Sequence, residues 1–142
     1  MTDTPDISEA EWEVMQVLWD APGLTANDVV DRVAGRRGWN PRTVKTLLNR
    51  LLTKRALRFE AEGNRYRYFP AVSREACVRT ESRSFLSRVF DGAAAPAVLH
   101  LLSQCDVDEF RKLSPEEVRH LRQLLDEAGN EGRRQDTGDR KQ

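Results

Sequence analysis

Hydrophobic residues in the first half of the chain recur at the spacing of amphipathic helices. One such run begins at a capping-box pattern at Ser8 and extends to about Trp19. A second run, with a weaker capping box at Thr25, extends to Gly35. A third begins at the N-cap Asn40 and carries apolar residues at positions i, i+3, i+4 and i+7, namely Val44, Leu47, Leu48 and Leu51. The pattern predicts three short helices.

The period of the pattern then changes from 3.6 residues to two. Apolar and charged residues alternate over 57–62 and again over 65–69, as in half-exposed strands. Between them, Gly63 and Asn64 both tolerate positive φ angles, so the two strands should close as a hairpin. Three helices followed by a hairpin are the elements of a winged helix-turn-helix, which we expect over residues 1–72.

Helical spacing returns over residues 73–129, with helices expected near 73–92, 96–105 and 114–129. Helices this short bury little surface among themselves, yet they carry many large apolar side chains. We therefore expect a small helical dimerisation domain in a mainly α protein, and a homodimer. The residues expected to share its core and its dimer interface are Phe85, Leu86, Val89, Phe90, Leu101, Leu102, Leu121 and Leu125.

Composition narrows the class of protein. The chain has 142 residues, which is short for an α/β enzyme with separate cofactor and substrate domains. No apolar run approaches the roughly 20 residues of a membrane-spanning helix, and the first residues do not resemble a secretory signal. We expect a cytoplasmic protein in which Cys77 and Cys105 are free thiols in the core. Residues 130–142 contain no large apolar side chain and are expected to be a disordered tail.

Charge is balanced overall but not locally. The 23 basic residues equal the 23 acidic ones, whereas residues 36–67 hold ten basic residues and two acidic ones. Residues 1–35 hold one basic and eight acidic residues. Because salt screens exposed charges beyond about 8 Å, a ligand responds to the charge of the face that it approaches. A protein with no net charge can thus present a cationic face.

The exposed side of the predicted third helix has the chemistry of a DNA-reading surface. Its residues are hydrogen-bonding types without an acid, and its first turns would face base edges in the major groove. Residues further along, and those of the hairpin, would approach phosphates or the minor groove. The bases would be read by Arg42, Thr43, Lys45 and Thr46, and the backbone contacted by Asn49, Arg50, Lys54, Arg55, Arg65 and Arg67.

Three segments of the chain resemble the penicillinase and methicillin-resistance repressor (BlaI/MecI) family of bacterial regulators. They are residues 7–15 (ISEAEWEVM), 39–51 (WNPRTVKTLLNRL) and 84–92 (SFLSRVFDG), and the resemblance covers about residues 7–128. It implies a homodimeric repressor without a cofactor, whose winged helices bind an inverted-repeat operator in double-stranded DNA. It also places Arg42, Thr43, Lys45 and Thr46 in the operator-reading turn.

The resemblance further implies a release mechanism. In the family, a membrane sensor protease system leads to cleavage of the dimerisation domain, typically at an Asn-Phe bond after a Val-Leu pair. Here Val98-Leu99 is followed by His100-Leu101, which makes this bond the candidate cleavage site. Because the residues at the bond differ from the family pattern, the protease and the inducer stay open, and so does release by a small ligand.

Other classes of function have less support in the sequence. The chain has two histidines, His100 and His120, and no recognisable hydrolase, metalloprotease or phosphate-loop motif, so we expect no enzyme. Those histidines and the two cysteines do not have the spacing of a common zinc site, so no metal is expected. The remaining alternative to a repressor is a winged helix that binds another protein.

Overall fold

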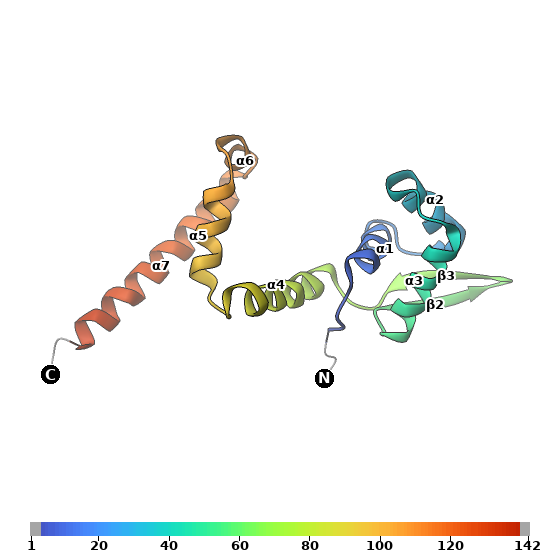
Figure 1. The fold of residues 1–142 in the computed structure, drawn as a ribbon, viewed down its shortest axis with the longest axis horizontal. Helices are drawn as coiled ribbons and strands as arrows, with labels where there is room; N and C mark the ends of the chain where they lie inside the picture. The colour runs from blue at the N-terminus through green and yellow to red at the C-terminus, as the bar shows by residue number, and fades with distance from the viewer. Residues whose placement is uncertain (1–3, 140–142) are drawn as a thin grey trace. The chain divides into compact units, whose positions relative to one another are not determined.

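The computed structural model describes residues 4–139, with side chains described as far as residue 131, and the chain divides after Ala93 into two compact units (Figure 1). The first unit contains four helices and a three-stranded antiparallel sheet with the strand order β1-β3-β2. Its elements confirm the predicted winged helix. They are α1 (Glu9–Asp20), β1 (Leu24–Thr25), α2 (Ala26–Arg37), α3 (Pro41–Thr53), β2 (Leu57–Glu62), β3 (Arg65–Pro70) and α4 (Arg74–Phe90).

The core of the first unit lies where α1, α2 and α3 pack against one another, with β3 beside α1. The apolar positions that recur along each helix are the ones that become buried, as their helical spacing predicts. On α3 the buried residues lie on one side, so the opposite side is left to solvent. The largest fully buried side chains are Val14, Met15, Leu18, Val29, Val33, Val44, Leu48, Leu51 and Cys77.

Of the two predicted capping boxes, the one at Thr25 forms completely and the one at Ser8 only in half. At the start of α2, the Thr25 amide donates to Asp28 Oδ2 over 3.2 Å, and the Asp28 amide donates to Thr25 Oγ1 over 3.3 Å. At the start of α1 only half of the box forms, since the Glu11 amide donates to Ser8 Oγ while the Glu11 carboxylate binds elsewhere. The box that the sequence marks as weaker is thus the complete one.

The hairpin forms as predicted, with Gly63 at a φ of 61° in its turn. Phe59 pairs with Tyr68 and Ala61 with Tyr66 across β2 and β3, so their side chains share one face of the wing. At the base of this face Leu57 and Tyr68 are buried in the core. The third strand, β1, was not predicted, because a strand of two residues leaves no detectable alternation.

The helix α4 begins in the winged-helix unit. Cys77, in its second turn, is buried in the core, and burial raises the pKa of its thiol. Just before α4, the Val72 carbonyl accepts a 3.0 Å hydrogen bond from Trp19 Nε1. These contacts tie the start of α4 to α1, and the compact unit continues to Ala93, whereas the sequence placed the boundary at residues 72–73.

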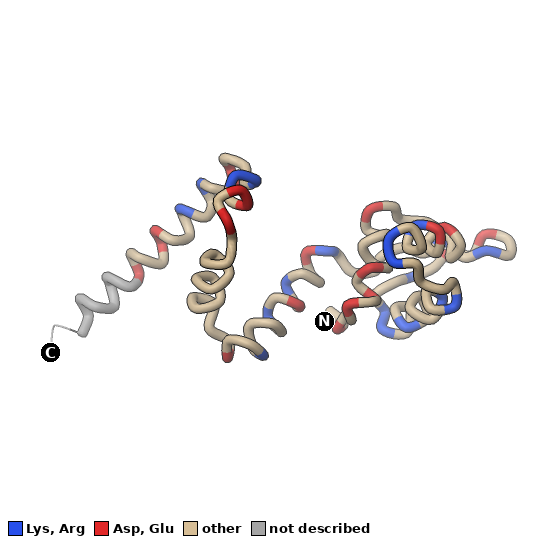
Figure 2. Tube along the Cα trace, turned by 45° about the horizontal axis from the view of Figure 1, so that its top comes forward, with Lys and Arg blue, Asp and Glu red and all other residues tan. Residues whose placement is uncertain are grey.

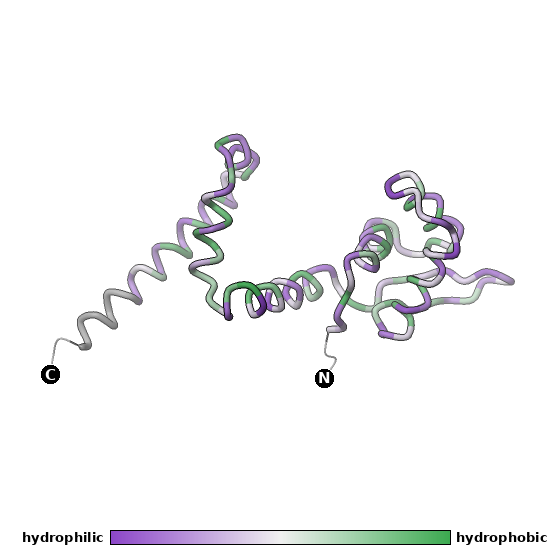
Figure 3. The backbone as a smooth tube through the Cα atoms, in the orientation of Figure 1, coloured by the Kyte–Doolittle hydropathy of each residue, from purple (hydrophilic) through white to green (hydrophobic). Residues whose placement is uncertain are grey.

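The second unit consists of α5 (Ala94–Gln104), α6 (Val107–Arg111) and α7 (Pro115–Asp139). Among its described side chains Ala97 alone is buried. Cys105 is only half-buried and lies outside the core cluster, contrary to expectation. The unit therefore keeps most of its apolar side chains in contact with solvent, and Figure 3 shows green hydrophobic segments along α5 and α7.

The expected disordered tail is wrong for residues 130–139, which continue α7 to Asp139. Gly129 lacks the positive φ of a helix-ending glycine, so nothing stops the helix there. The sequence after Gly129 has no large apolar residue, but the backbone hydrogen bonds of a helix do not require one. Residues 140–142 of the predicted tail lie outside the described residues.

Within the described range, no single helix is long and apolar enough to cross a bilayer. Only α4 and α5 taken together, across the break between them, meet the requirement of length and composition.

Candidate nucleic-acid interface

The solvent-facing side of α3 is cationic and polar. Within the helix no residue is acidic, and Val44, Leu47, Leu48 and Leu51 hold the opposite side in the core. Figure 2 shows the basic residues of this unit in blue. The predicted base-reading and phosphate-contacting residues of the helix are all exposed, namely Arg42, Thr43, Lys45, Thr46, Asn49 and Arg50.

The three cations among these residues have no side-chain partner within the described part of the chain. The side chains of Arg42, Lys45 and Arg50 make no hydrogen bond or ion pair there. The Thr46 hydroxyl, by contrast, donates to the Arg42 carbonyl over 2.9 Å and is satisfied within the helix. The face thus presents three positive charges that no carboxylate of the described residues neutralises.

The start of α3 is ordered by its own sequence. Asn40 Oδ1 accepts a 2.9 Å hydrogen bond from the Arg42 amide, and Pro41 occupies the first turn, where its missing N–H costs nothing. Trp39, just before the cap, packs against the core. The first turn of α3, with Arg42 and Thr43, is therefore held in place before any ligand arrives.

A cleft of about 330 Å³ lies between the beginning of α2, the middle of α3 and the wing. Its lining is polar and contains two cations, Lys45 and Arg65. The partial positive charge at the start of α2 is offset by the Asp28 carboxylate of its own capping box, so the attraction for an anion comes from Lys45 and Arg65. The residues that line it are Thr25, Ala26, Asn27, Lys45, Asn49, Asn64, Arg65, Tyr66 and Tyr68.

The contribution of α2 and of the wing turn to this cleft is not apparent from the sequence pattern. Asn27 lies two residues after the cap Thr25, and Asn64 lies in the turn that was read only as a hairpin signal. Tyr66, 52% exposed, packs against Phe59, 48% exposed, with the two rings tilted by 52° and their centroids 4.5 Å apart. Two large aromatic side chains exposed on one face of a basic hairpin were the available signal.

The two arginines of β3 differ in their surroundings. Arg65 lines the cleft and has no ion-pair partner among the residues described. Arg67 Nε is paired with Glu62, and Arg67 Nη1 donates to the Gly23 carbonyl over 2.8 Å. The hydrogen bond that Arg67 Nε donates to the Glu62 carboxylate raises the pKa of Arg67. Arg65 is therefore the wing cation available to a ligand, whereas Arg67 is already hydrogen-bonded to Glu62 and to the Gly23 carbonyl.

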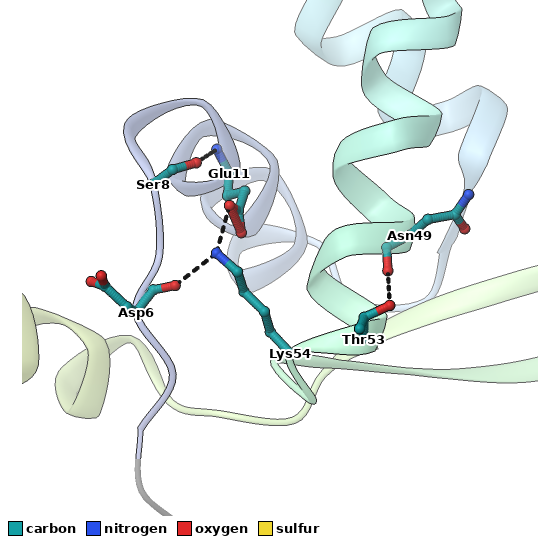
Figure 4. Close-up of polar contacts among 6 residues, drawn as sticks. All are labelled: Asp6, Ser8, Glu11, Asn49, Thr53 and Lys54. Atoms are coloured by element: carbon teal, nitrogen blue, oxygen red, sulfur yellow. Dashed lines mark hydrogen bonds and ion pairs between the residues drawn. The ribbon is translucent and has the colours of Figure 1, made fainter.

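Lys54 also has partners inside the protein (Figure 4). Its Nζ donates to Glu11 Oε1 over 2.7 Å and to the Asp6 carbonyl over 2.9 Å. The position of Lys54 after a basic helix predicts a phosphate contact, but in the structure its charge is paired with a carboxylate 43 residues earlier. A partner this distant in sequence could not be predicted from the pattern around Lys54.

The other predicted sites lie on the helices after the wing. Phe85, Leu86 and Phe90 on α4 are half-buried, and the rings of Phe85 and Phe90 lie 5.8 Å apart. His100 and Leu101, the candidate cleavage site, lie within α5 and are exposed. Across residues 4–139 no cluster of three or more His, Cys, Asp or Glu side chains could hold a metal. The exposed members of the predicted interface are Val89, Leu101, Leu102, Leu121 and Leu125.

Comparison with known proteins gives consistent matches. The family model described as Penicillinase repressor matches residues 7–127. The chain is 35% identical over 130 residues to the penicillinase repressor of Bacillus licheniformis, covering 92% of this chain and 97% of the relative. It is 30% identical over 122 residues to the methicillin resistance regulatory protein MecI of Mammaliicoccus sciuri, covering 86% and 94%.

Among solved structures, the chain is similar to the monomeric form of Bacillus licheniformis BlaI determined in complex with the blaP half-operator. The sequences are 36% identical, the TM-score is 0.47, and the match covers 54% of this chain and 93% of that one. The family match spans both compact units of the present chain. This chain therefore belongs to the penicillinase repressor family, whose members are DNA-binding transcriptional repressors and not enzymes.

Proposed function

We propose that this protein represses transcription as a homodimer that binds an inverted-repeat operator, with α3 of each subunit in the major groove. The observation that carries the proposal is the exposed face of α3, which lacks acids and presents the unpaired cations Arg42, Lys45 and Arg50. DNA carries one negative charge per about 1.7 Å of its axis, so such a face gains much of its affinity by displacing counterions.

Within this arrangement the residues have distinct roles. Arg42 and Lys45, in the first two turns of α3, pair with acceptors on base edges, assisted by Thr43 and Thr46. Asn49 and Arg50 lie further along the helix and contact phosphates. Arg65, on the far side of the cleft, contacts the backbone that passes between α3 and the wing. Lys54 and Arg67, whose charges pair with Glu11 and Glu62, are given no DNA contact in this proposal.

The most informative experiment selects bound duplexes from a random pool with the purified full-length protein. We expect an inverted repeat, because two copies of α3 related by a twofold axis read the same half-site. Affinity for the selected duplex should fall steeply with salt, with a log–log slope of about 0.9 per neutralised phosphate. Failure to enrich any duplex, or a slope near zero, would contradict DNA binding and favour the alternative of a protein-binding winged helix.

Substitutions separate base reading from phosphate contact. Arg42→Ala should cost about 1–3 kcal/mol on the selected duplex and relax the preference at one base pair, if the guanidinium reads a base. Arg50→Ala should weaken binding to all duplexes alike and lower the salt slope by about 0.9. Arg79→Ala, at an exposed position on α4, is the matched control and should leave affinity unchanged. An equal loss on all duplexes for Arg42→Ala would reassign Arg42 to a phosphate.

The homodimer is supported by the exposed apolar side chains of the second unit. Leu99, Leu125 and Val107 are each more than 60% exposed, and a monomer gains nothing from leaving them in water. A linked second DNA-binding unit raises avidity by roughly 10² to 10⁴ over a single one. Separation of the subunits would thus release the operator without any change at Arg42 or Lys45.

Cleavage between His100 and Leu101 is the proposed route to that separation. Both residues are exposed, but the bond lies inside α5, so a protease must first unwind this helix locally. Mass spectrometry of induced cells should find a fragment that ends at His100. Intact protein released from its operator would instead support a small ligand as the inducer.

A further inference from the structure

Glu11 is a buried carboxylate that none of the proposed DNA contacts involves. It lies in the first turn of α1, and its side chain is 3% exposed. Its Oε1 accepts the hydrogen bond from Lys54 Nζ, while its Oε2 is buried without a hydrogen-bond partner among the described residues. A buried carboxylate with one unsatisfied oxygen depends strongly on the single cation that compensates it. Lys54 is that cation.

Lys54 occupies a particular place on the proposed DNA-binding element. It is the C-cap residue of α3, at the opposite end of the helix from Arg42. Its ammonium group joins three segments, because it binds Glu11 on α1 and the Asp6 carbonyl in the segment before α1 (Figure 4). The ion pair thus connects the end of α3 directly to α1 and to the N-terminal segment.

Apolar packing alone leaves the orientation of α3 incompletely defined. Burial of Val44, Leu47, Leu48 and Leu51 stabilises the helix against the core, but this term is non-directional. A charge-assisted hydrogen bond of 2.7 Å is directional, and displacing it leaves a buried charge uncompensated. A shift or rotation of α3 would therefore strain the Lys54–Glu11 hydrogen bond in addition to disturbing the apolar contacts of the helix.

We propose that Glu11 and Lys54 are positioning residues which, through their ion pair, fix the orientation of α3 in which its first turns fit the base edges. The inference rests on the proposed function, since the helix that the ion pair would orient is the proposed DNA-reading helix. Glu11 is too deeply buried to contact DNA, so it can affect binding only indirectly, through its charge or through the position of α3.

The test compares full-length variants on the selected duplex and on an unrelated duplex over a range of salt concentrations. Glu11→Gln keeps the shape of the side chain and removes its charge, and Lys54→Met removes the cation. Lys54→Arg keeps both charge and donor and serves as the conservative variant. Arg50→Met, one turn earlier on the exposed face of α3, is the control for direct phosphate contact. Circular dichroism first establishes that each variant is folded at the temperature used.

An effect of the Glu11 charge on DNA and an effect of Glu11 on the orientation of α3 predict opposite results for Glu11→Gln. Removing a negative charge should strengthen binding to every duplex, whereas a loosened α3 should weaken binding to the selected duplex alone. We expect both Glu11→Gln and Lys54→Met to lower the ratio of selected to unrelated affinity by about tenfold, the loss of one base contact. Lys54→Arg should restore most of this ratio. The salt slope should fall by about 0.9 in Arg50→Met and stay unchanged in Lys54→Met.

Two outcomes would overturn the proposal. If Lys54→Met lowers the salt slope by about 0.9 while Glu11→Gln binds like the wild type, Lys54 contacts a phosphate directly. If the affinity ratio is unchanged in both folded variants, the pair contributes to stability alone. Should Lys54→Met fail to fold, Glu11→Gln and Lys54→Arg still give the same comparison. A wild-type protein that prefers no duplex would instead remove the proposed function itself.

Discussion

Arg55 shows how a single residue ends the candidate recognition helix. Its φ is 64°, in the left-handed region that side chains other than glycine rarely adopt. The Arg55 amide donates to the Leu52 carbonyl and the Ala56 amide to the Leu51 carbonyl, which is the Schellman pattern of helix termination. Ala56, fully buried, then leads into β2. The chain accepts an unfavourable backbone conformation in order to turn from α3 into the wing.

Replacing Arg55 by glycine should therefore stabilise the protein. Glycine adopts this conformation without the clash of a Cβ atom, so Arg55→Gly should raise the free energy of unfolding by about 0.5–1 kcal/mol. Urea denaturation followed by circular dichroism measures the change. The control Arg50→Gly places glycine inside α3 and should lower stability by about 1 kcal/mol. A loss of stability in Arg55→Gly would mean that the arginine side chain contributes more than its backbone costs.

The role of a single residue could be predicted from the sequence only where its interaction partners lie nearby along the chain. The exposed cations Arg42 and Lys45 could be identified, because a helix with one apolar side must turn its other side outward. The partner of Lys54 could not, because Glu11 reaches it only after α1 and α3 have packed. The sequence predicts that Glu11 completes the capping box of Ser8. In the structure its carboxylate binds Lys54 instead.

At the scale of an element, the start of α2 depends on pH through Asp28. Its hydrogen bonds from Thr25 lower the pKa of the Asp28 carboxyl, with a smaller contribution from Arg67. A carboxyl whose pKa is lower in the folded state stabilises the protein fully above its unfolded value, near pH 4, and loses this contribution as pH falls through the folded value. The capping box of α2 should thus weaken only in acid.

The variant Asp28→Asn tests this dependence. At pH 7 its urea midpoint should lie below that of the wild type, and the difference should shrink as pH falls below about 4, where the wild-type carboxyl becomes protonated too. Asp31→Asn, an exposed carboxylate in the same helix, is the matched control. A difference that does not change with pH would show that the Asp28 charge plays no part.

Helices and strands with a clear period of apolar residues could be predicted from the sequence. Very short elements, and the end of a helix that carries no apolar residues, could not. α3 and the hairpin followed from their spacing and turn residues, and the start of α7 from its serine, proline and glutamate sequence. β1 has two residues and α6 has five, too few for a period to emerge. The end of α7 was misplaced because Gly129 was read as a stop although its backbone stays helical.

At the scale of the whole molecule, the proposed dimer should be separable by charge. Phe85 and Phe90 are half-buried on α4, and replacing both by aspartate would place two charges in an apolar contact. Sedimentation velocity should then find monomers. The control pair Ser84→Asp and Ser87→Asp adds the same charge at exposed positions of the same helix and should leave the dimer intact. Dimers that persist in the phenylalanine variant would place the interface on α5 and α7.

The unequal burial of the two thiols has a practical consequence. Cys77 is sealed in the winged-helix core and its pKa is raised, so little of the nucleophilic thiolate forms near neutral pH. Cys105, half-buried in the second unit, is the more accessible of the two. A maleimide dye added to the native protein should attach at Cys105 and leave the winged-helix unit unlabelled. Without any substitution, Cys105 can thus carry a donor or an acceptor fluorophore. Exchange of subunits in the proposed dimer can then be followed by energy transfer.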